Sequence, residues 1–238
     1  MIRFWRLYKG EIHRLFKYKI IFFGFLVSII WIIIVALSDQ TTAQALVPTL
    51  IVMDAGMMSI ILLAASFFFE KQEGTIKTLF VTPVPLSWIL LAKVASAMTS
   101  GILSMLLVAG SAWIVHGIAT NLLLMGIYVL FIVAGNTAIG YVFILSSKDF
   151  LSMLVKLSMV LILFYIPSML VPLGIIPKRL EFIALISPVY SGSFLIESLY
   201  SDLPTAQIVF AIVYLGVVST TIYPFVVYKK YQKVAVQG

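Results

Sequence analysis

The sequence predicts an all-α, polytopic membrane protein with six transmembrane helices, an N-terminal amphipathic interfacial helix and a broken re-entrant segment before the last span. Hydrophobic residues make up 62% of the 238 residues and charged residues only 11%, whereas about a quarter is charged in soluble domains. The apolar residues form long runs, and about 20 such residues match one helical crossing of a bilayer. Because these runs do not alternate with polar residues, they favour helices over the strands of a barrel.

The expected spans are 20–37, 49–69, 88–115, 122–145, 157–171 and 205–228. A short polar loop containing Asp39 and Pro48 joins the first two spans. This loop is too short to hold a domain outside the membrane. No domain boundary or internal repeat is apparent, so 1–238 is predicted to be one domain.

Residues 1–19 form a separate unit at the start of the chain. On a helix with 100° per residue, one arc is apolar and aromatic and the other is basic. The apolar arc holds Phe4, Trp5, Tyr8, Ile12, Leu15 and Phe16, and the basic arc holds Arg3, Arg6, Lys9, His13, Arg14 and Lys17. This pattern is typical of a helix that lies in the headgroup layer. The alternative is a flanking charge cluster that only sets the topology.

Residues 172–204 differ from the spans because they contain four prolines and five charged residues. Two apolar pieces lie within them, 180–186 and 189–199, and neither is long enough to cross a bilayer. We expect two short helices that dip into the membrane edge and return.

Lysine and arginine are distributed unevenly over the six expected spans. Fourteen of the 16 fall on the side of the N-terminus, and only Lys178 and Arg179 fall on the other side. Because cytoplasmic loops carry the excess of Lys and Arg, both termini are predicted to be cytoplasmic, in a plasma or inner membrane.

The sequence contains no recognisable catalytic constellation. It has no cysteine, and its two histidines, His13 and His116, lie on opposite sides of the membrane in this topology. No Gly-rich phosphate loop, zinc-binding His pair or nucleophile elbow is present. The chain is therefore expected to have no ATPase site, no metal and no cofactor of its own. Since no soluble basic face is available, nucleic acid is not an expected partner.

The segment 70–87 is the most polar internal stretch. It leaves a span with two acids, Glu70 and Glu73, and Gly74 then breaks the helix. Thr75 is a suitable cap for a short helix over 76–81 that Pro83 would end. Such a helix could lie across the cytoplasmic end of two spans and transmit motion from a soluble partner. The alternative is a tight connector.

This segment resembles a motif of type-2 ABC transporter permeases, the small six-span drug and antibiotic exporters. The pattern is E-x-E-G-T, a short apolar stretch, T-P-x-P and then L-L-x-x-K. The matching residues are Glu70, Glu73, Gly74, Thr75, Leu79, Thr82, Pro83, Leu90, Leu91 and Lys93. The amphipathic N-terminal helix, the six spans and the broken segment with Ser187-Pro188 and Glu197 also agree with the family.

The resemblance implies a dimeric permease, 1–238 being one transmembrane permease domain, with a separate ABC ATPase subunit that binds ATP and Mg²⁺. It implies that 70–82 is the ATPase-docking and coupling element. The expected partners are that ATPase, a second permease in a homo- or heterodimer, and membrane lipid. The expected cargo is a hydrophobic or amphipathic drug, antibiotic or small peptide.

Three charged residues fall in or near the expected spans. Asp54 lies 16 residues before Glu70, roughly 24 Å along a helix, and is expected near the outer interface, where it faces either a pathway or solvent. Lys93 is expected to extend its amine to the cytoplasm. Glu197 is expected near the outer surface, either at a substrate exit or bonded to freed backbone groups.

Two other classes of function stay open from the sequence. One is a stand-alone channel or ion-coupled carrier, which needs acids or broken helices near the midplane. The other is a membrane protein that binds a peptide for immunity or sensing without moving it.

Overall fold

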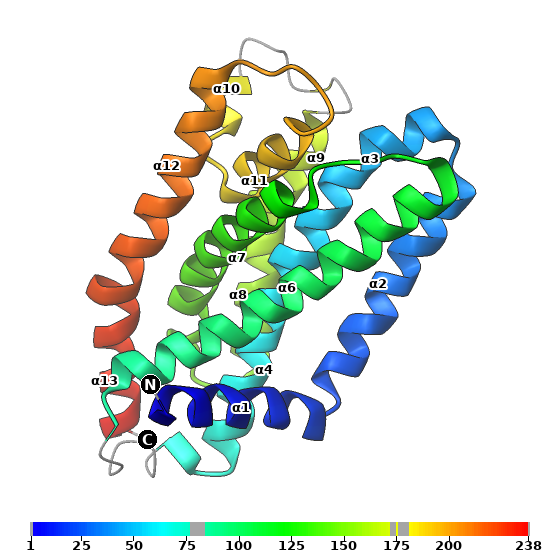
Figure 1. The fold of residues 1–238 in the computed structure, drawn as a ribbon. Coiled ribbons are helices and arrows are strands. Elements are labelled where there is room, and N and C mark those ends of the chain that lie inside the picture. The colour runs from blue at the N-terminus through cyan, green and yellow to red at the C-terminus, as the bar shows by residue number, and fades with distance from the viewer. Residues whose placement is uncertain (1, 77–83, 172–174, 176–180, 238) are drawn as a thin grey trace.

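The structure is a computed structural model that describes residues 2–76, 84–171, 175 and 181–237. Within these ranges the chain is helical and contains no strand (Figure 1). Six helices are long and apolar enough to cross a membrane, as the sequence predicts. They are Ile20–Leu37, Gln40–Gln72, Leu86–His116, Leu122–Ile144, Phe150–Leu170 and Thr205–Lys233. The chain is therefore a multi-pass membrane protein in architecture.

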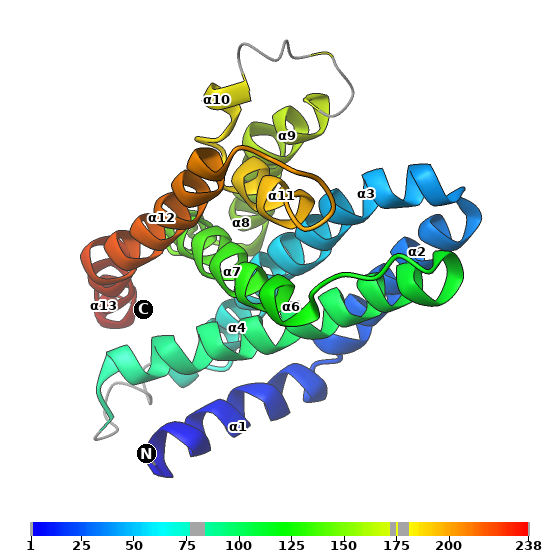
Figure 2. The ribbon, with the colours of Figure 1, turned by 45° about the horizontal axis from the view of Figure 1, so that its top comes forward.

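Both ends of the chain lie at one end of the bundle (Figure 1), which we call the terminal end. Helix α1 (Ile2–Lys17) lies across this end and packs mainly along α6 (Leu86–His116), as Figure 2 shows. Lys19 adopts a left-handed backbone conformation with φ of 58°. The chain turns there from α1 into α2 (Ile20–Leu37).

The predicted apolar arc of α1 does not act as one surface. Leu15 is buried against the bundle, while Trp5 and Phe16 are 54% and 61% exposed. Glu11, which belongs to neither predicted arc, is buried. The helix therefore turns one face to the other helices and leaves two aromatic side chains outside.

The second span begins nine residues earlier than predicted. Helices α3 (Gln40–Val52), η1 (Met53–Met57) and α4 (Met58–Gln72) follow one another in a single 33-residue helix. The prediction failed because Asp39 caps the helix, accepting from the Thr42 backbone N–H at 3.1 Å. Pro48, predicted to lie in the loop, lies buried inside α3. Membrane helices tolerate such a proline where neighbouring helices pack around it.

The third and fourth spans match their predicted ranges. They are α6 and α7 (Leu122–Ile144), and the side chain of Asn121 caps the start of α7. The fifth span begins at Phe150 instead of 157, and it comprises α8 (Phe150–Val160), η2 (Leu161–Tyr165) and α9 (Ile166–Leu170). Asp149 starts it early by accepting from the Ser152 N–H at 2.7 Å.

The segment before the last span contains two short helices, α10 (Glu181–Ala184) and α11 (Pro188–Glu197). Every residue of α11 from Pro188 to Ile196 is buried. The helix packs against α3, α7 and α12 at the end of the bundle opposite the termini (Figure 1). The last span consists of α12 (Thr205–Ile222), η4 (Tyr223–Val227) and α13 (Tyr228–Gln237), and it continues beyond the predicted end at 228.

Candidate functional site

Three helices bring charged side chains together at the terminal end, and a fourth adds a tyrosine hydroxyl. The Lys93 amine on α6 donates to the Glu70 carboxylate on α4 at 2.5 Å and to the Glu11 carboxylate on α1 at 3.1 Å. Lys93 and Glu70 are 1% and 0% exposed. We call this group the ion cluster, and its members are Glu11, Arg14, Ser66, Glu70, Lys93 and Tyr231.

The remaining members complete the hydrogen bonding of the two carboxylates. Arg14 forms an ion pair with Glu70 and approaches Glu11 at 3.4 Å. Ser66 accepts from the Lys93 amine at 3.1 Å, and Tyr231 on α13 donates to Glu70 at 3.3 Å. Two carboxylates thus face two cations, so the buried charges balance. Buried ions persist where they are paired and hydrogen-bonded in this way.

Helical spacing explains how the cluster forms. Glu11 and Arg14 are three residues apart on α1, and Ser66 and Glu70 are four residues apart on α4. Residues at these spacings share one helix face. Helix α4 therefore presents Ser66 and Glu70 to Lys93. Helix α1 presents Glu11 to Lys93 and Arg14 to the carboxylates.

The expected orientation of Lys93 was wrong. Its amine was expected to reach the cytoplasm, but the side chain is fully buried between the two carboxylates. An amine at the start of a span extends outward when no counter-ion is in reach. Here Glu11, from a helix outside the spans, supplies one of the partners.

The motif residues Glu70 and Glu73 lie three residues apart at the end of α4 and face in different directions. Glu70 is turned into the ion cluster, and Glu73 is exposed and accepts a hydrogen bond from Tyr18. This hydrogen bond raises the pKa of Tyr18, whose ring stacks on Phe69 with centroids 4.2 Å apart. The motif therefore has one inward and one outward acid.

Gly74 ends α4, as predicted, with a left-handed φ of 67° that glycine adopts without strain. The Thr75 hydroxyl donates to the Glu70 carbonyl at 3.2 Å, and its predicted role as a helix cap stays a prediction. Leu79, Thr82 and Pro83 lie outside the described residues, as does most of the predicted short helix.

Asp54 lies deeper than the sequence analysis expected. It is 1% exposed, and the Ser28 hydroxyl donates to it at 2.5 Å. Ser28 is the ninth of the 18 residues of α2, a helix roughly 27 Å long at 1.5 Å per residue. Asp54 therefore sits near the middle of the membrane and not at its outer interface. The expectation failed because the helix begins at Gln40, 14 residues before Asp54.

The helix around Asp54 is irregular. Met53–Met57 forms a π-helical turn, a feature that often marks functional positions in α-helices. A Cβ on Gly56 would lie 3.2 Å from the Tyr165 hydroxyl and 3.4 Å from the Asn136 amide nitrogen. The glycine thus lets α7 and the fifth span bring polar groups against this turn.

Glu197 lies at the C-terminal end of α11, where its side chain is exposed. Its carbonyl accepts from the backbone N–H groups of Tyr200 and Ser201 at 2.9 and 3.1 Å. Glu197 and Asp54 therefore occupy different levels of the bundle, one at the end opposite the termini and one in the middle.

Four residues of the ion cluster were absent from the predicted site: Glu11, Arg14, Ser66 and Tyr231. A signal for Glu11 exists, because it is the one acid among the six cations of 1–19 and lies three residues from Arg14. No comparable signal marks Ser66 or Tyr231. Among the described residues, no group of three His, Asp or Glu is arranged to hold a metal ion.

The comparisons with known proteins add no relative. No protein-family model matches the chain, and no curated protein matches it either. The resemblance to ABC permeases therefore rests on the motif residues and on the order of the spans.

Proposed function

We propose that the chain is the permease subunit of an ABC exporter that works as a dimer with a separate ATPase and moves a hydrophobic or amphipathic compound outward. The observation that carries this proposal is the position of Glu70. The E-x-E-G-T segment follows the second span, and its first acid is fixed to α1, α6 and α13 through the ion cluster.

The ion cluster suggests how motion would reach the spans. A partner that binds the exposed part of the motif, Glu73 and the residues after it, would push on the end of α4. A shift of α4 alone would pull Glu70 away from Lys93, Arg14 and Tyr231 together, and leaving a buried charge without its partner costs about 3–5 kcal/mol. Helices α1, α6 and α13 would therefore move with α4 instead of sliding past it.

In this proposal the terminal end faces the cytoplasm, where the ATPase binds ATP and Mg²⁺. The excess of Lys and Arg at this end supports that orientation. ATP-driven closure of the partner subunits would move the motif segments and open a path between two permeases.

The direct test is to combine Glu73→Lys with Gly74→Pro in the complex with its ATPase. Glu73 is exposed, so the charge reversal leaves the core intact, and proline cannot adopt the positive φ of Gly74. We expect ATP hydrolysis to continue while transport falls at least tenfold. Lys148→Glu, in a different loop at the terminal end, is the control and should leave coupling unchanged. If the double variant transports as well as the native chain, the docking assignment is wrong.

The first measurement is simpler. The chain is purified in nanodiscs with a candidate ATPase from the same cell, and ATP hydrolysis is recorded. Co-purification and stimulated hydrolysis support the permease role. A chain that purifies alone and stimulates no ATPase contradicts it.

Asp54 favours a second candidate function, an ion-coupled carrier. An acid near the midplane on an irregular helix is the feature that such carriers need. Asp54→Asn keeps the shape and can still accept from Ser28. In vesicles without any ATPase, a carrier would drive uptake or efflux with a proton or sodium gradient, and the variant would lose this transport. An absence of gradient-driven transport by the native chain excludes the carrier.

A further inference from the structure

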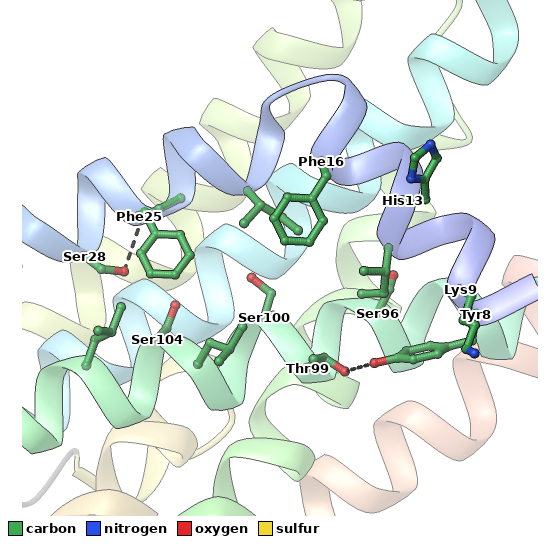
Figure 3. A pocket seen from close by; sticks show the side chains of 15 residues that line it. Tyr8, Lys9, His13, Phe16, Phe25, Ser28, Ser96, Thr99, Ser100 and Ser104 are labelled. Carbon is green, nitrogen blue, oxygen red and sulfur yellow. Dashed lines mark hydrogen bonds between the residues drawn. The ribbon is translucent and has the colours of Figure 1, made fainter. Parts of the chain in front are cut away.

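A groove runs along α6 between α1 and α2, with a volume of about 370 Å³, within the range of small-molecule sites. We call it the α1–α6 groove. Its walls are mainly apolar, and Ile12, Phe16, Phe25, Leu103 and Leu107 contribute to them. Figure 3 shows the labelled residues from Tyr8, Lys9 and Thr99 at one end to Ser28 and Ser104 at the other.

The groove has the depth of one membrane leaflet. On α6 it extends from Ser96 to Leu107, which is roughly 16 Å at 1.5 Å per residue. Half of a hydrocarbon core of about 30 Å is nearly the same length. Ser28 marks its inner end at the middle of α2, so the groove covers the leaflet at the terminal end and stops at the midplane.

The end of the groove beside α1 carries the positive charge of Lys9, with the His13 imidazole next to it. Lys9 and His13 line it, both are exposed, and no acid is among its lining residues. Glu11 lies between them in sequence, but its carboxylate is buried in the ion cluster on the other face of α1. The charge of Lys9 is therefore not neutralised from its own helix.

Hydroxyl groups lie just inside the end that carries Lys9. Thr99 and Ser100 line the groove there. The Thr99 hydroxyl donates to the Ala95 carbonyl at 2.9 Å and accepts from the Tyr8 hydroxyl at 2.7 Å, so Ser100 is the donor offered to a ligand. A phospholipid presents the same order of chemistry from the surface inward: an anionic phosphate, ester carbonyls that accept hydrogen bonds, and an apolar chain. Basic pockets beside membrane helices bind anionic headgroups for this reason.

We propose that the α1–α6 groove binds one anionic phospholipid from the leaflet at the terminal end. The phosphate lies against Lys9 and His13, an ester carbonyl accepts from Ser100, and one acyl chain follows α6 to Ser28. Two observations carry this assignment: the positive charge of Lys9 complements a phosphate, and the groove is as long as one leaflet is deep. It does not depend on whether the chain transports anything.

Native mass spectrometry of the purified full chain, taken from nanodiscs with equal phosphatidylglycerol and phosphatidylcholine, tests the proposal. We expect one phosphatidylglycerol to stay bound, at least fivefold more often than phosphatidylcholine. Lys9→Gln with His13→Gln should bring this ratio close to one. Arg6→Gln with Lys17→Gln removes charge from the same helix outside the groove lining and should leave the ratio unchanged.

A groove-filling variant gives a test that does not alter charge. A Cβ on Gly24 meets no atom within 4 Å and Gly24 lines the groove, so Gly24→Leu should fit and occupy the space of the acyl chain. Gly110→Leu is the matched control, because Gly110 is equally open but lies outside the groove. We expect Gly24→Leu to lose the bound lipid and Gly110→Leu to keep it, with both variants eluting as the native chain does.

Three results would overturn the proposal. Equal loss of lipid in the two charge variants would show a general attraction to the basic helix and no site. Equal retention of both lipids by the native chain would show that the groove does not select charge. If the native chain gives the mass of a dimer without lipid and Gly24→Leu gives only the monomer, a second copy covers the groove instead.

Discussion

At the scale of single residues, burial decides what each charged group can do. Lys93, Glu70 and Asp54 all lie within expected spans or at their ends, yet they have different surroundings. The first two neutralise each other inside the ion cluster. Among the residues that the structure describes, Asp54 has no ion pair, and hydroxyl groups of Ser28 and Ser104 lie near its carboxylate. Paired charges stabilise a bundle end, and an unpaired acid in a membrane is a candidate for function.

The ion cluster leads to a prediction about stability. Lys93→Met removes the central cation, so Glu11 and Glu70 share only Arg14 and lose their best donor. We expect the free energy of unfolding to fall by about 3–5 kcal/mol. Thermal unfolding of the detergent-solubilised chain measures this change.

Lys233→Met is the matched control, because Lys233 is exposed on α13. Its effect should stay within about 0.5 kcal/mol. A Lys93→Met variant as stable as this control would show that the buried pairing does not stabilise the bundle.

At the scale of elements, close helix packing depends on glycines that face other spans. A Cβ on Gly140 of α7 would lie 2.7 Å from Cγ2 and 3.0 Å from Cγ1 of Ile60 on α4. Because isoleucine is branched at Cβ and stiff at χ1, it cannot move away easily. Small residues allow the same close approach in many membrane bundles.

The corresponding prediction compares two glycines of the same helix. Gly140→Ala should lower the free energy of unfolding by about 1–3 kcal/mol, because the added methyl group overpacks the contact with Ile60. Gly126→Ala meets its nearest atom at 3.7 Å and should be neutral or stabilising, since alanine favours a helix by about 1 kcal/mol. Denaturation midpoints of both variants test this, and equal effects would contradict it.

At the scale of the whole molecule, six spans return the chain to the end where it began (Figure 1). The loops 38–39, 117–121 and 198–204 at the opposite end are short, and the Lys and Arg residues of the described chain gather at the terminal end. By the excess of Lys and Arg, we predict that the terminal end faces the cytoplasm.

Single cysteines can test this topology, because the native chain contains none. Ala119→Cys and Ser201→Cys lie at the end opposite the termini, and Gln72→Cys and Lys233→Cys lie at the terminal end, all at exposed positions. We expect an impermeant maleimide to label the first pair on intact cells and the second pair only after permeabilisation. The reverse pattern would invert the orientation and with it the ATPase-docking proposal.

The sequence by itself determined the architecture. Runs such as 20–37, with no charged residue, can be stable only as helices in lipid, so composition alone fixed their number and type. The third and fourth spans also had their ends marked locally, by Pro85 and Gly117 for one and Asn121 for the other. Gly74 marked the end of α4 in the same way. Asp39 and Asp149 are equally local caps, yet the spans that they begin were predicted to start later, because each lies in a polar stretch that reads as a loop.

Tertiary structure decided which charges meet and how deep they lie. Lys93 is paired because α1 carries Glu11 to it from 82 residues away, and no local pattern encodes that distance. Asp54 lies near the midplane because Asp39 begins the helix early and α2 places Ser28 beside it. Burial and pairing depend on several helices at once, so the ion cluster and the α1–α6 groove exist only once the helices have packed.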